Sequence, residues 1–268
     1  MSKIKANGAE FYYELHGKGQ PIILISGYNS DHLAWSPILS ELSQYAQVLV
    51  FDNRGMGQTS DDGRALSVEL MAHDVMALSK ELNLKKPHIV GSSMGGAIAQ
   101  TVASLYPEEI NKLSILVTTA KWRKAPLLAF DTLLKMREAN IEFDFIFDSL
   151  VPWLFGEKFL QDKEAIALLK KMMLEDPHPQ SLIDQKRQFE VLKKFDGRAK
   201  LKNIMAPTLI INGYEDLISL PEDSEYLVKH IENATLKTLD CAHMVVFEVG
   251  QLFVKLLLEF FMLNGKKA

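Results

Sequence analysis

The chain has 268 residues, of which 47% are hydrophobic and 24% are charged, as is ordinary for a globular protein that buries a large core. The formal net charge of −4 leaves no basic excess, so nucleic acids and anionic membranes are not expected as partners. The single cysteine, Cys241, excludes an internal disulfide, and the first residues lack the apolar stretch of a signal peptide, so we expect a cytoplasmic location.

Short apolar runs of the buried-strand type alternate with helical patterns along the chain. Asn7-Gly8 predicts a two-residue hairpin turn that leads into a strand at residues 9–15. Further strands are expected at residues 22–25, 48–51, 88–90, 113–117, 208–211 and 235–239. Residues 34–45 and 67–82 carry apolar side chains at helical spacing, and Ser67 is a plausible N-cap. This alternation predicts an α/β fold, with a mostly parallel sheet and helices on both faces.

The interval between the strands at 113–117 and 208–211 breaks this alternation. It holds about ninety residues, and an unstructured loop of that length is improbable in a compact domain. The interval is rich in large apolar side chains: Leu127, Leu128, Phe130, Leu133, Leu134, Met136, Phe143, Phe145, Ile146, Phe147, Trp153, Leu154 and Phe155. We therefore predict a helical cap at residues 121–200, inserted into a core made of residues 1–120 and 201–268.

The longest apolar segment, residues 246–263, is too often interrupted for a membrane span. Its polar residues recur at helical spacing and form one stripe: Glu248, Gln251, Lys255 and Glu259. The pattern favours a helix that packs its apolar side on a sheet.

Residues 91–95 read Gly-Ser-Ser-Met-Gly, a G-x-S-x-G pentapeptide between the strand at 88–90 and a helical run at 96–103. In a strained strand-to-helix turn of this kind, glycines two positions from the nucleophile avoid collisions with the backbone. The start of the helix directs its amides and the positive end of its dipole at the site. Ser93 is therefore the candidate nucleophile, because Ser92 lacks glycine on both sides. A plain Gly/Ser loop between strand and helix is the alternative interpretation.

At this point the chain resembles the α/β-hydrolase fold family over about residues 11–261. The family's His-Gly after its third strand is replaced here by Ser26-Gly27-Tyr28. Its D-x-R-G-x-G-x-S segment is similar to residues 52–60, where the serine comes one position late. The resemblance implies the α/β-hydrolase fold with an inserted cap. We expect Asp52 and Arg54 to pin their loop rather than to act in catalysis.

The resemblance also implies the partners of the serine. His243 follows the last expected strand, where the family carries its catalytic base, and Asp216 matches the family's G-x-x-D in the order Ser, Asp, His. Glu215 and Asp240 remain rivals for the acid. The two backbone amides of an oxyanion hole would belong to Met94 and, by resemblance, to Tyr28.

These residues predict a serine hydrolase that cleaves a carboxylic ester or lactone of a small, hydrophobic substrate through an acyl-enzyme. A C–C bond hydrolase, a cofactor-free perhydrolase and a small-molecule receptor with little turnover remain as alternatives. A dehalogenase or an epoxide hydrolase is not expected, since both use aspartate where this chain has Ser93. The sequence has no zinc-type cluster and no complete dinucleotide motif, so neither a metal nor an organic cofactor is expected. A homodimer is left open.

Overall fold

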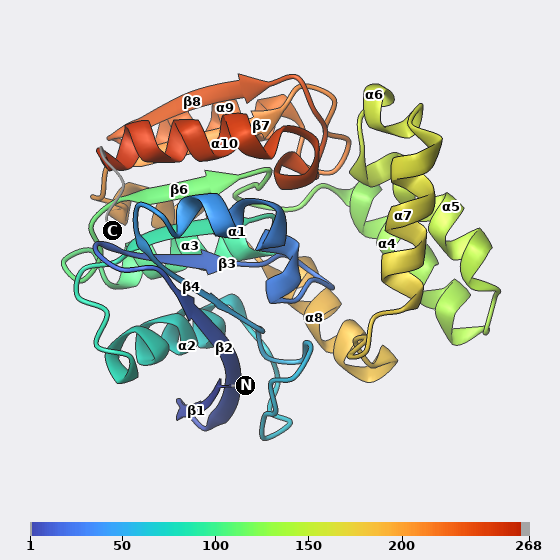
Figure 1. Ribbon diagram of the computed structural model, residues 1–268, viewed down its shortest axis with the longest axis horizontal. Helices are drawn as coiled ribbons and strands as arrows, with labels where there is room; N and C mark the ends of the chain where they lie inside the picture. The colour runs from blue at the N-terminus through green and yellow to red at the C-terminus, as the bar shows by residue number, and fades with distance from the viewer. Residues whose placement is uncertain (1, 264–268) are drawn as a thin grey trace.

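The computed structural model describes residues 2–263 of the chain, which fold around one eight-stranded sheet (Figure 1). The sheet order is β1-β2-β4-β3-β5-β6-β7-β8. The strands are β1 Ser2–Ala6, β2 Ala9–His16, β3 Pro21–Ile25, β4 Gln47–Phe51, β5 His88–Ser92, β6 Leu113–Leu116, β7 Thr208–Gly213 and β8 Ala234–Leu239. Strands β3 to β8 pair in parallel, and β1 and β2 add an antiparallel edge. The predicted α/β class is confirmed.

The antiparallel edge comes from the predicted hairpin. Asn7 and Gly8 both have positive φ, of 44° and 76°, as a tight hairpin turn requires. They join β1 to β2, and β2 then pairs with β4. From β3 onward, a helical segment connects each strand to the next one along the chain. All six strands β3 to β8 are therefore parallel, and their carboxyl ends lie along one edge of the sheet.

Helices cover both faces of the sheet because the buried strands are apolar on both sides. Along β3, Ile23 and Ile25 belong to the core on one face, while Ile22 and Leu24 belong to the core on the other. The helices of the core are α1 Ser36–Leu42, α2 Val68–Glu81, α3 Met94–Leu105, α9 Pro221–His230 and α10 Val245–Phe261. Helices α1 and α10 lie together on the face nearer the viewer in Figure 1, and α2 and α3 pack together on the other.

Two helix predictions can be compared directly with the structure. Ser67 caps α2, with its Oγ accepting from the Leu70 amide at 3.1 Å, as expected. The helix predicted at residues 34–45 is shorter than expected. A 3₁₀ turn, η1 His32–Trp35, comes first, and α1 then runs only over Ser36–Leu42 with Pro37 in its first turn. Proline favours the start of a helix, because its missing amide is one that would have no partner there.

Five helices fill the interval between β6 and β7 and lie beyond the carboxyl ends of the parallel strands (Figure 1). They are α4 Lys124–Glu138, α5 Phe143–Leu154, α6 Glu157–Leu160, α7 Lys163–Leu174 and α8 Leu182–Lys194, and a 3₁₀ turn, η2 Arg198–Asn203, follows them. Part of this region has a small apolar core of its own, built on Phe147, Val151 and Phe155. We refer to α4–α8 as the cap. The cap therefore lies over the edge of the sheet where the loops carrying Ser93 and His243 begin.

The segment at 246–263 packs on the sheet as helix α10. Its apolar side, which includes Phe253 and Leu257, is fully buried, while Gln251, Lys255 and Glu259 are exposed. Within residues 2–263, no helix is long and apolar enough to cross a membrane.

Candidate functional site

Ser93 lies at a strained turn between β5 and α3. Its φ of 55° and ψ of −119° are unusual for a residue other than glycine, and strain of this kind gathers at functional sites. The flanking glycines make the turn sterically feasible. A Cβ on Gly91 would lie 2.2 Å from the Gly95 carbonyl oxygen, and a Cβ on Gly95 would lie 2.1 Å from that of Ile25. The turn therefore exposes the Ser93 side chain at the N-terminus of α3.

His243 reaches Ser93 from the loop between β8 and α10. Its Nε2 lies 3.0 Å from Ser93 Oγ, and its Nδ1 lies 2.9 Å from Asp216 Oδ2. Because one ring nitrogen faces a carboxylate, that nitrogen carries the proton and the other is free to accept one from the hydroxyl. The structure thus brings together three residues that are up to 150 positions apart in the chain.

Asp216 is fully buried in the loop after β7. Besides His243, its carboxylate accepts hydrogen bonds from the Ile218 amide at 2.8 Å and from the Ser219 amide and hydroxyl at 3.2 and 2.7 Å. These donors satisfy the carboxylate and fix its direction. The rival Glu215 instead accepts from the Glu157 amide of the cap at 2.9 Å, and Asp240 is exposed.

The amides of Tyr28 and Met94 lie on the two backbone segments next to Ser93. Within residues 2–263, neither N–H has a hydrogen-bond acceptor. A Cβ on Gly27 would lie 3.2 Å from Ser93 Cβ, so glycine is what allows the loop after β3 to lie this close. Ser26, which replaces the family's histidine, donates its hydroxyl to the Asp31 carbonyl at 2.7 Å and holds the loop from inside.

Comparison with known proteins shows the family of the chain. A family model described as the alpha/beta hydrolase fold matches residues 20–249. The chain belongs to the α/β-hydrolase fold family. It is 27% identical to a putative carbamate hydrolase, RutD, of Azorhizobium caulinodans, over 94% of this chain and 95% of the relative. It is also 27% identical to 3-oxoadipate enol-lactonase 1 of Acinetobacter baylyi, over 88% of this chain and 86% of the relative.

Solved structures lead to the same fold. The crystal structure of the enol-lactonase from Burkholderia xenovorans superposes with a TM-score of 0.86 at 21% sequence identity, covering 97% of this chain and all of that one. At this identity the likeness extends to the fold alone. The family match places this α/β-hydrolase among hydrolases.

In this α/β-hydrolase, Asp52 and Arg54 hold the loop after β4, as expected. Asp52 accepts from the His32 ring at 2.7 Å and from the Gln58 amide at 2.8 Å. Arg54 is fully buried and pairs with Asp74 through Nε and Nη2 at 2.6 and 2.9 Å. Burial raises the pKa of Asp74 even though the Arg54 partner acts to lower it.

Asp31, His32 and Asp52 form a cluster whose ligand atoms lie within 4.8 Å of one another. Both oxygens of Asp52 already accept hydrogen bonds from His32 and from the Gln58 amide, and Asp31 accepts from the Leu33 amide at 2.9 Å. Hydrogen bonding within the loops therefore accounts for this cluster without an ion.

The cap contacts the histidine loop through groups that the sequence did not reveal. The Leu154 carbonyl at the end of α5 accepts from the amides of His243 and Met244 at 3.0 and 3.1 Å. Glu248 accepts from the Ala242 amide and from the Gly156 amide of the cap, both at 3.0 Å. Glu248 belongs to the polar stripe expected on this helix, and its position in the first turn of α10 directs its side chain at both loops. Nothing in the helical periodicity distinguishes it from the exposed members.

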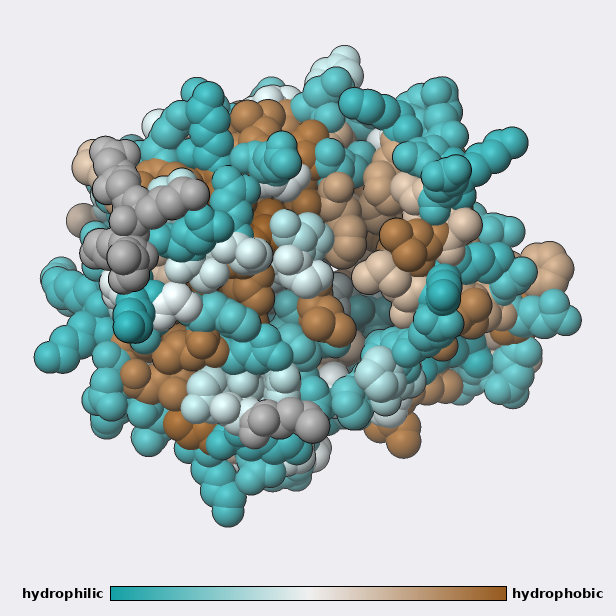
Figure 2. Space-filling model, viewed as in Figure 1, coloured by the Kyte–Doolittle hydropathy of each residue, from teal (hydrophilic) through white to brown (hydrophobic). Residues whose placement is uncertain are grey.

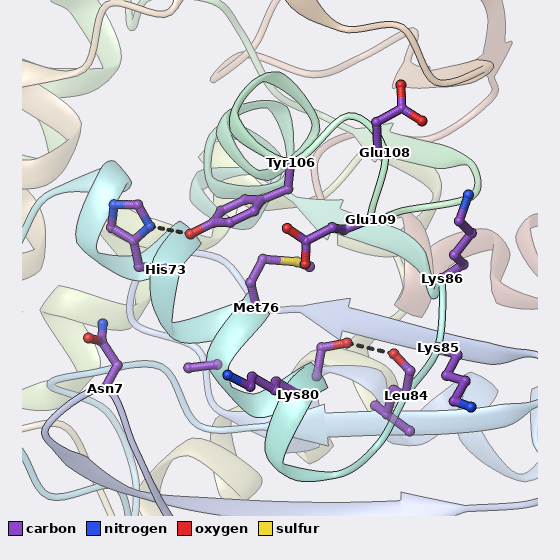
Figure 3. A pocket seen from close by; sticks show the side chains of 12 residues that line it. Asn7, His73, Met76, Lys80, Leu84, Lys85, Lys86, Tyr106, Glu108 and Glu109 are labelled. Atoms are coloured by element: carbon purple, nitrogen blue, oxygen red, sulfur yellow. Dashed lines mark hydrogen bonds between the residues drawn. The ribbon is translucent and has the colours of Figure 1, made fainter.

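A surface groove with a volume of about 710 Å³ lies away from this site (Figure 3). It runs between α2 and the segment after α3, where the His73 ring and the Tyr106 hydroxyl are hydrogen-bonded. Lysines and glutamates form much of its polar lining, and none of the five predicted site residues borders it. The groove is therefore separate from the site at Ser93.

Proposed function

We propose that this α/β-hydrolase cleaves a carboxylic ester or a lactone of a small, hydrophobic substrate through an acyl-enzyme on Ser93. The observation that carries the proposal is the hydrogen-bonded chain from Ser93 through His243 to Asp216. A serine hydroxyl is a poor nucleophile until a base takes its proton, and His243 Nε2 lies within hydrogen-bond reach of it. The buried Asp216 holds the ring in the required tautomer and stabilises the imidazolium that forms.

The reaction proceeds in two halves. In the first, Ser93 Oγ forms a bond to the substrate carbonyl carbon while its proton moves to His243 Nε2. The tetrahedral intermediate then expels the alcohol oxygen, which takes that proton from His243. In the second half, a water molecule gives its proton to His243 and attacks the acyl-enzyme. The carboxylic acid leaves, and the proton returns to Ser93 Oγ. A lactone follows the same steps, except that its alcohol stays attached to the acyl group.

Charge that develops on the carbonyl oxygen would be held by the amides of Tyr28 and Met94. Both belong to segments that border Ser93, and neither donates to another group of residues 2–263. The start of α3 adds the positive end of the helix dipole at the same place. Donors that are fixed before the reaction stabilise the oxyanion without reorganising, which typically contributes about 3 kcal/mol for each donor.

The substrate class is supported by the relatives and by the surroundings of the site. Two relatives are named as an enol-lactonase and a putative carbamate hydrolase, and lactones and carbamates both contain a carbonyl carbon bonded to oxygen or nitrogen. Phe130 and Phe189 of the cap flank the Tyr28 ring. Figure 2 shows the surface hollowed where the cap meets the core, with apolar residues along the hollow. These features favour an apolar acyl or alcohol group.

Short-chain p-nitrophenyl esters, an aryl lactone and a fluorophosphonate probe test this proposal. We expect the wild type to turn over at least one substrate class and to be labelled. Ser93→Ala should lose labelling and at least about 10³-fold in kcat, because the residual rate would come from binding and the oxyanion donors alone. Ser92→Ala is the matched control and should keep both signals. A wild type that binds these compounds without turnover or labelling would contradict the proposal and favour a receptor.

A further inference from the structure

Gln188 of cap helix α8 is the buried side chain that links the cap to the loop carrying Tyr28. It is fully buried, and its Oε1 accepts from the Asn29 amide at 3.2 Å. Its Nε2 donates to the Arg54 carbonyl at 2.9 Å. Only this orientation of the side-chain amide fits, because one neighbour is a donor and the other an acceptor. One cap residue therefore bridges two loops of the core, 159 and 134 positions away in the chain.

The contact at Asn29 is one peptide away from the proposed oxyanion donor, the Tyr28 amide. Asn29 has a positive φ of 54°, in the left-handed region that asparagine tolerates better than most residues, and a backbone restraint at this point keeps the loop in one conformation. The hydrogen bond from its amide to Gln188 is such a restraint. Because neighbouring peptide planes share the dihedral angles between them, fixing the Asn29 peptide limits how far the Tyr28 N–H can turn.

The same loop is held from its two sides by different parts of the molecule. On the core side, the Ser26 hydroxyl donates to the Asp31 carbonyl, and Asn53 donates to the Ser26 carbonyl at 3.0 Å. On the cap side, the Tyr28 ring lies between Phe130 and Phe189, with centroids 5.7 and 6.1 Å away, and Gln188 holds the next amide. The direction of the Tyr28 amide thus depends on helix α8 as well as on the sheet.

We infer that Gln188 is a positioning residue for the oxyanion hole and that it makes oxyanion stabilisation depend on the seating of α8. The inference rests on the proposed function. Within residues 2–263, Gln188 hydrogen-bonds to the backbone of Asn29 and Arg54 and not to Ser93 or His243. Loss of its hydrogen bond lets the Tyr28 amide move away from the oxyanion position, which weakens binding of the transition state more than binding of the substrate.

The chain offers a matched control in Gln180, a second buried cap glutamine. Its Nε2 donates to the Gly55 carbonyl, so it joins the cap to the loop after β4, and within residues 2–263 it makes no hydrogen bond to the Tyr28 loop. Gln180→Met and Gln188→Met each remove one buried amide between cap and core. A general loosening of the cap affects both variants alike, whereas an effect on the oxyanion hole is specific to Gln188.

The test measures kcat, KM and the inhibition constant of a trifluoromethyl ketone, which adds to the serine and places an oxyanion at the proposed donors. We expect Gln188→Met to lower kcat by about 10- to 100-fold, to change KM by less than about threefold, and to weaken inhibition in parallel with kcat/KM. Gln188→Glu, which keeps the acceptor for Asn29, should recover part of the loss. Gln180→Met should stay within about threefold of wild type in all three quantities.

Two results would overturn the inference while leaving the proposed function intact. One is an active wild type for which Gln188→Met and Gln180→Met have equal effects at equal thermal stability. The other is a Gln188→Met variant whose loss lies in KM, with ketone inhibition unchanged. An inert wild type, in contrast, contradicts the proposed function itself, so the two failures are distinguishable.

Discussion

Two buried histidine–aspartate pairs in this protein have nearly the same first contact. His243 Nδ1 lies 2.9 Å from Asp216, and His32 Nδ1 lies 2.7 Å from Asp52. Both aspartates follow strands of the parallel sheet, and both accept further hydrogen bonds from backbone amides. Asp216 accepts from two amides of its own loop, and Asp52 accepts from the Gln58 amide of its own loop and from the His32 amide. A histidine that is held by a buried carboxylate is therefore a unit that this fold uses twice, and the pair alone does not define a reaction.

The two pairs differ at the second ring nitrogen. His243 Nε2 faces the Ser93 hydroxyl, whereas His32 Nε2 lies 3.6 Å from the Glu14 carboxylate. Burial alone would lower the pKa of His32, but the hydrogen bond to Asp52 and the charges of Asp52, Asp31 and Glu14 raise it above its ordinary value. Those surroundings favour a cation that ties loops together. What distinguishes the proposed catalytic pair, His243 and Asp216, is the serine hydroxyl that faces Nε2. The carboxylate that faces Nδ1 is common to both pairs.

The two pairs should differ most in how far kcat falls when the aspartate of each pair is replaced by asparagine. Asp216→Asn should lower kcat by about 10³- to 10⁴-fold, because the amide favours the wrong tautomer of His243 and no longer stabilises its cation. Asp52→Asn should lower kcat less than about tenfold, since Asp52 accepts from His32 and Gln58, and the direct hydrogen bond from this loop to the oxyanion segment belongs to Asn53. Steady-state rates on an active ester measure both.

Glu215 serves as the control for the assignment of Asp216 as the acid. Glu215 is adjacent in sequence but accepts from the cap amide of Glu157, so Glu215→Gln should keep kcat within about tenfold of wild type. If Glu215→Gln loses the rate and Asp216→Asn retains it, the assignment of the acid is wrong.

Loss of the Asp52 charge should also lower the stability of the fold. Asp52→Asn places an amide where the carboxylate accepts from the His32 ring, the His32 amide and the Gln58 amide, so one donor loses its acceptor. We expect a decrease of about 2–4 kcal/mol in the free energy of unfolding, which is the range for breaking a buried pair. Urea denaturation of Asp52→Asn, with Ser93→Ala as a control that leaves both pairs intact, measures it. An unchanged denaturation midpoint would show that Asp52 does not pin its loop.

A part of the fold or of the site could be predicted from the sequence where the residues that determine it are close together in the chain. The Ser93 turn could be predicted because its strand, its glycines and its helix are contiguous, so local sterics determine it. Five of the parallel strands, β3 to β7, could be predicted because strands that are buried on both faces are continuous apolar runs, whereas the edge strand β8 is largely exposed on its outer positions. Their chain order then led to candidates for the acid and the base on either side of β8, by resemblance to the family.

Contacts between polar side chains and distant backbone groups left no comparable signal. Gln188 binds an amide and a carbonyl of two loops that lie far from it in sequence, and such a bond has no period. Glu248 shares its helical face with exposed residues, so its turn toward the histidine loop depends on the tertiary fold. The Asp52 segment was expected to hold its loop, but its partner His32 comes from the loop after β3 and could not be identified by spacing.

The smallest expected effect is a pH dependence of stability at the structural pair of His32 and Asp52. The folded state raises the pKa of His32, so the folded protein binds that proton more tightly than the unfolded chain does. The resulting stabilisation is fully present below the unfolded-state pKa of about 6.5 and is lost as pH rises through the folded-state value. The stability lost in His32→Gln should therefore be larger at acidic pH than above neutrality, by on the order of 1 kcal/mol, the scale of one charge-assisted hydrogen bond.

Urea denaturation of wild type and His32→Gln across this pH range measures the difference. The acidic groups around the ring are Asp52, Asp31 and Glu14, and Asp52 makes the direct hydrogen bond. In an Asp52→Asn background, the pH-dependent part of the His32→Gln effect should shrink, because the hydrogen bond and the charge of Asp52 no longer favour the cation. A destabilisation by His32→Gln that grows with rising pH has the opposite sign. It would mean that the folded state binds the proton less tightly than the unfolded chain does. His32 would then be held as a neutral ring and not as the cation that its surroundings favour.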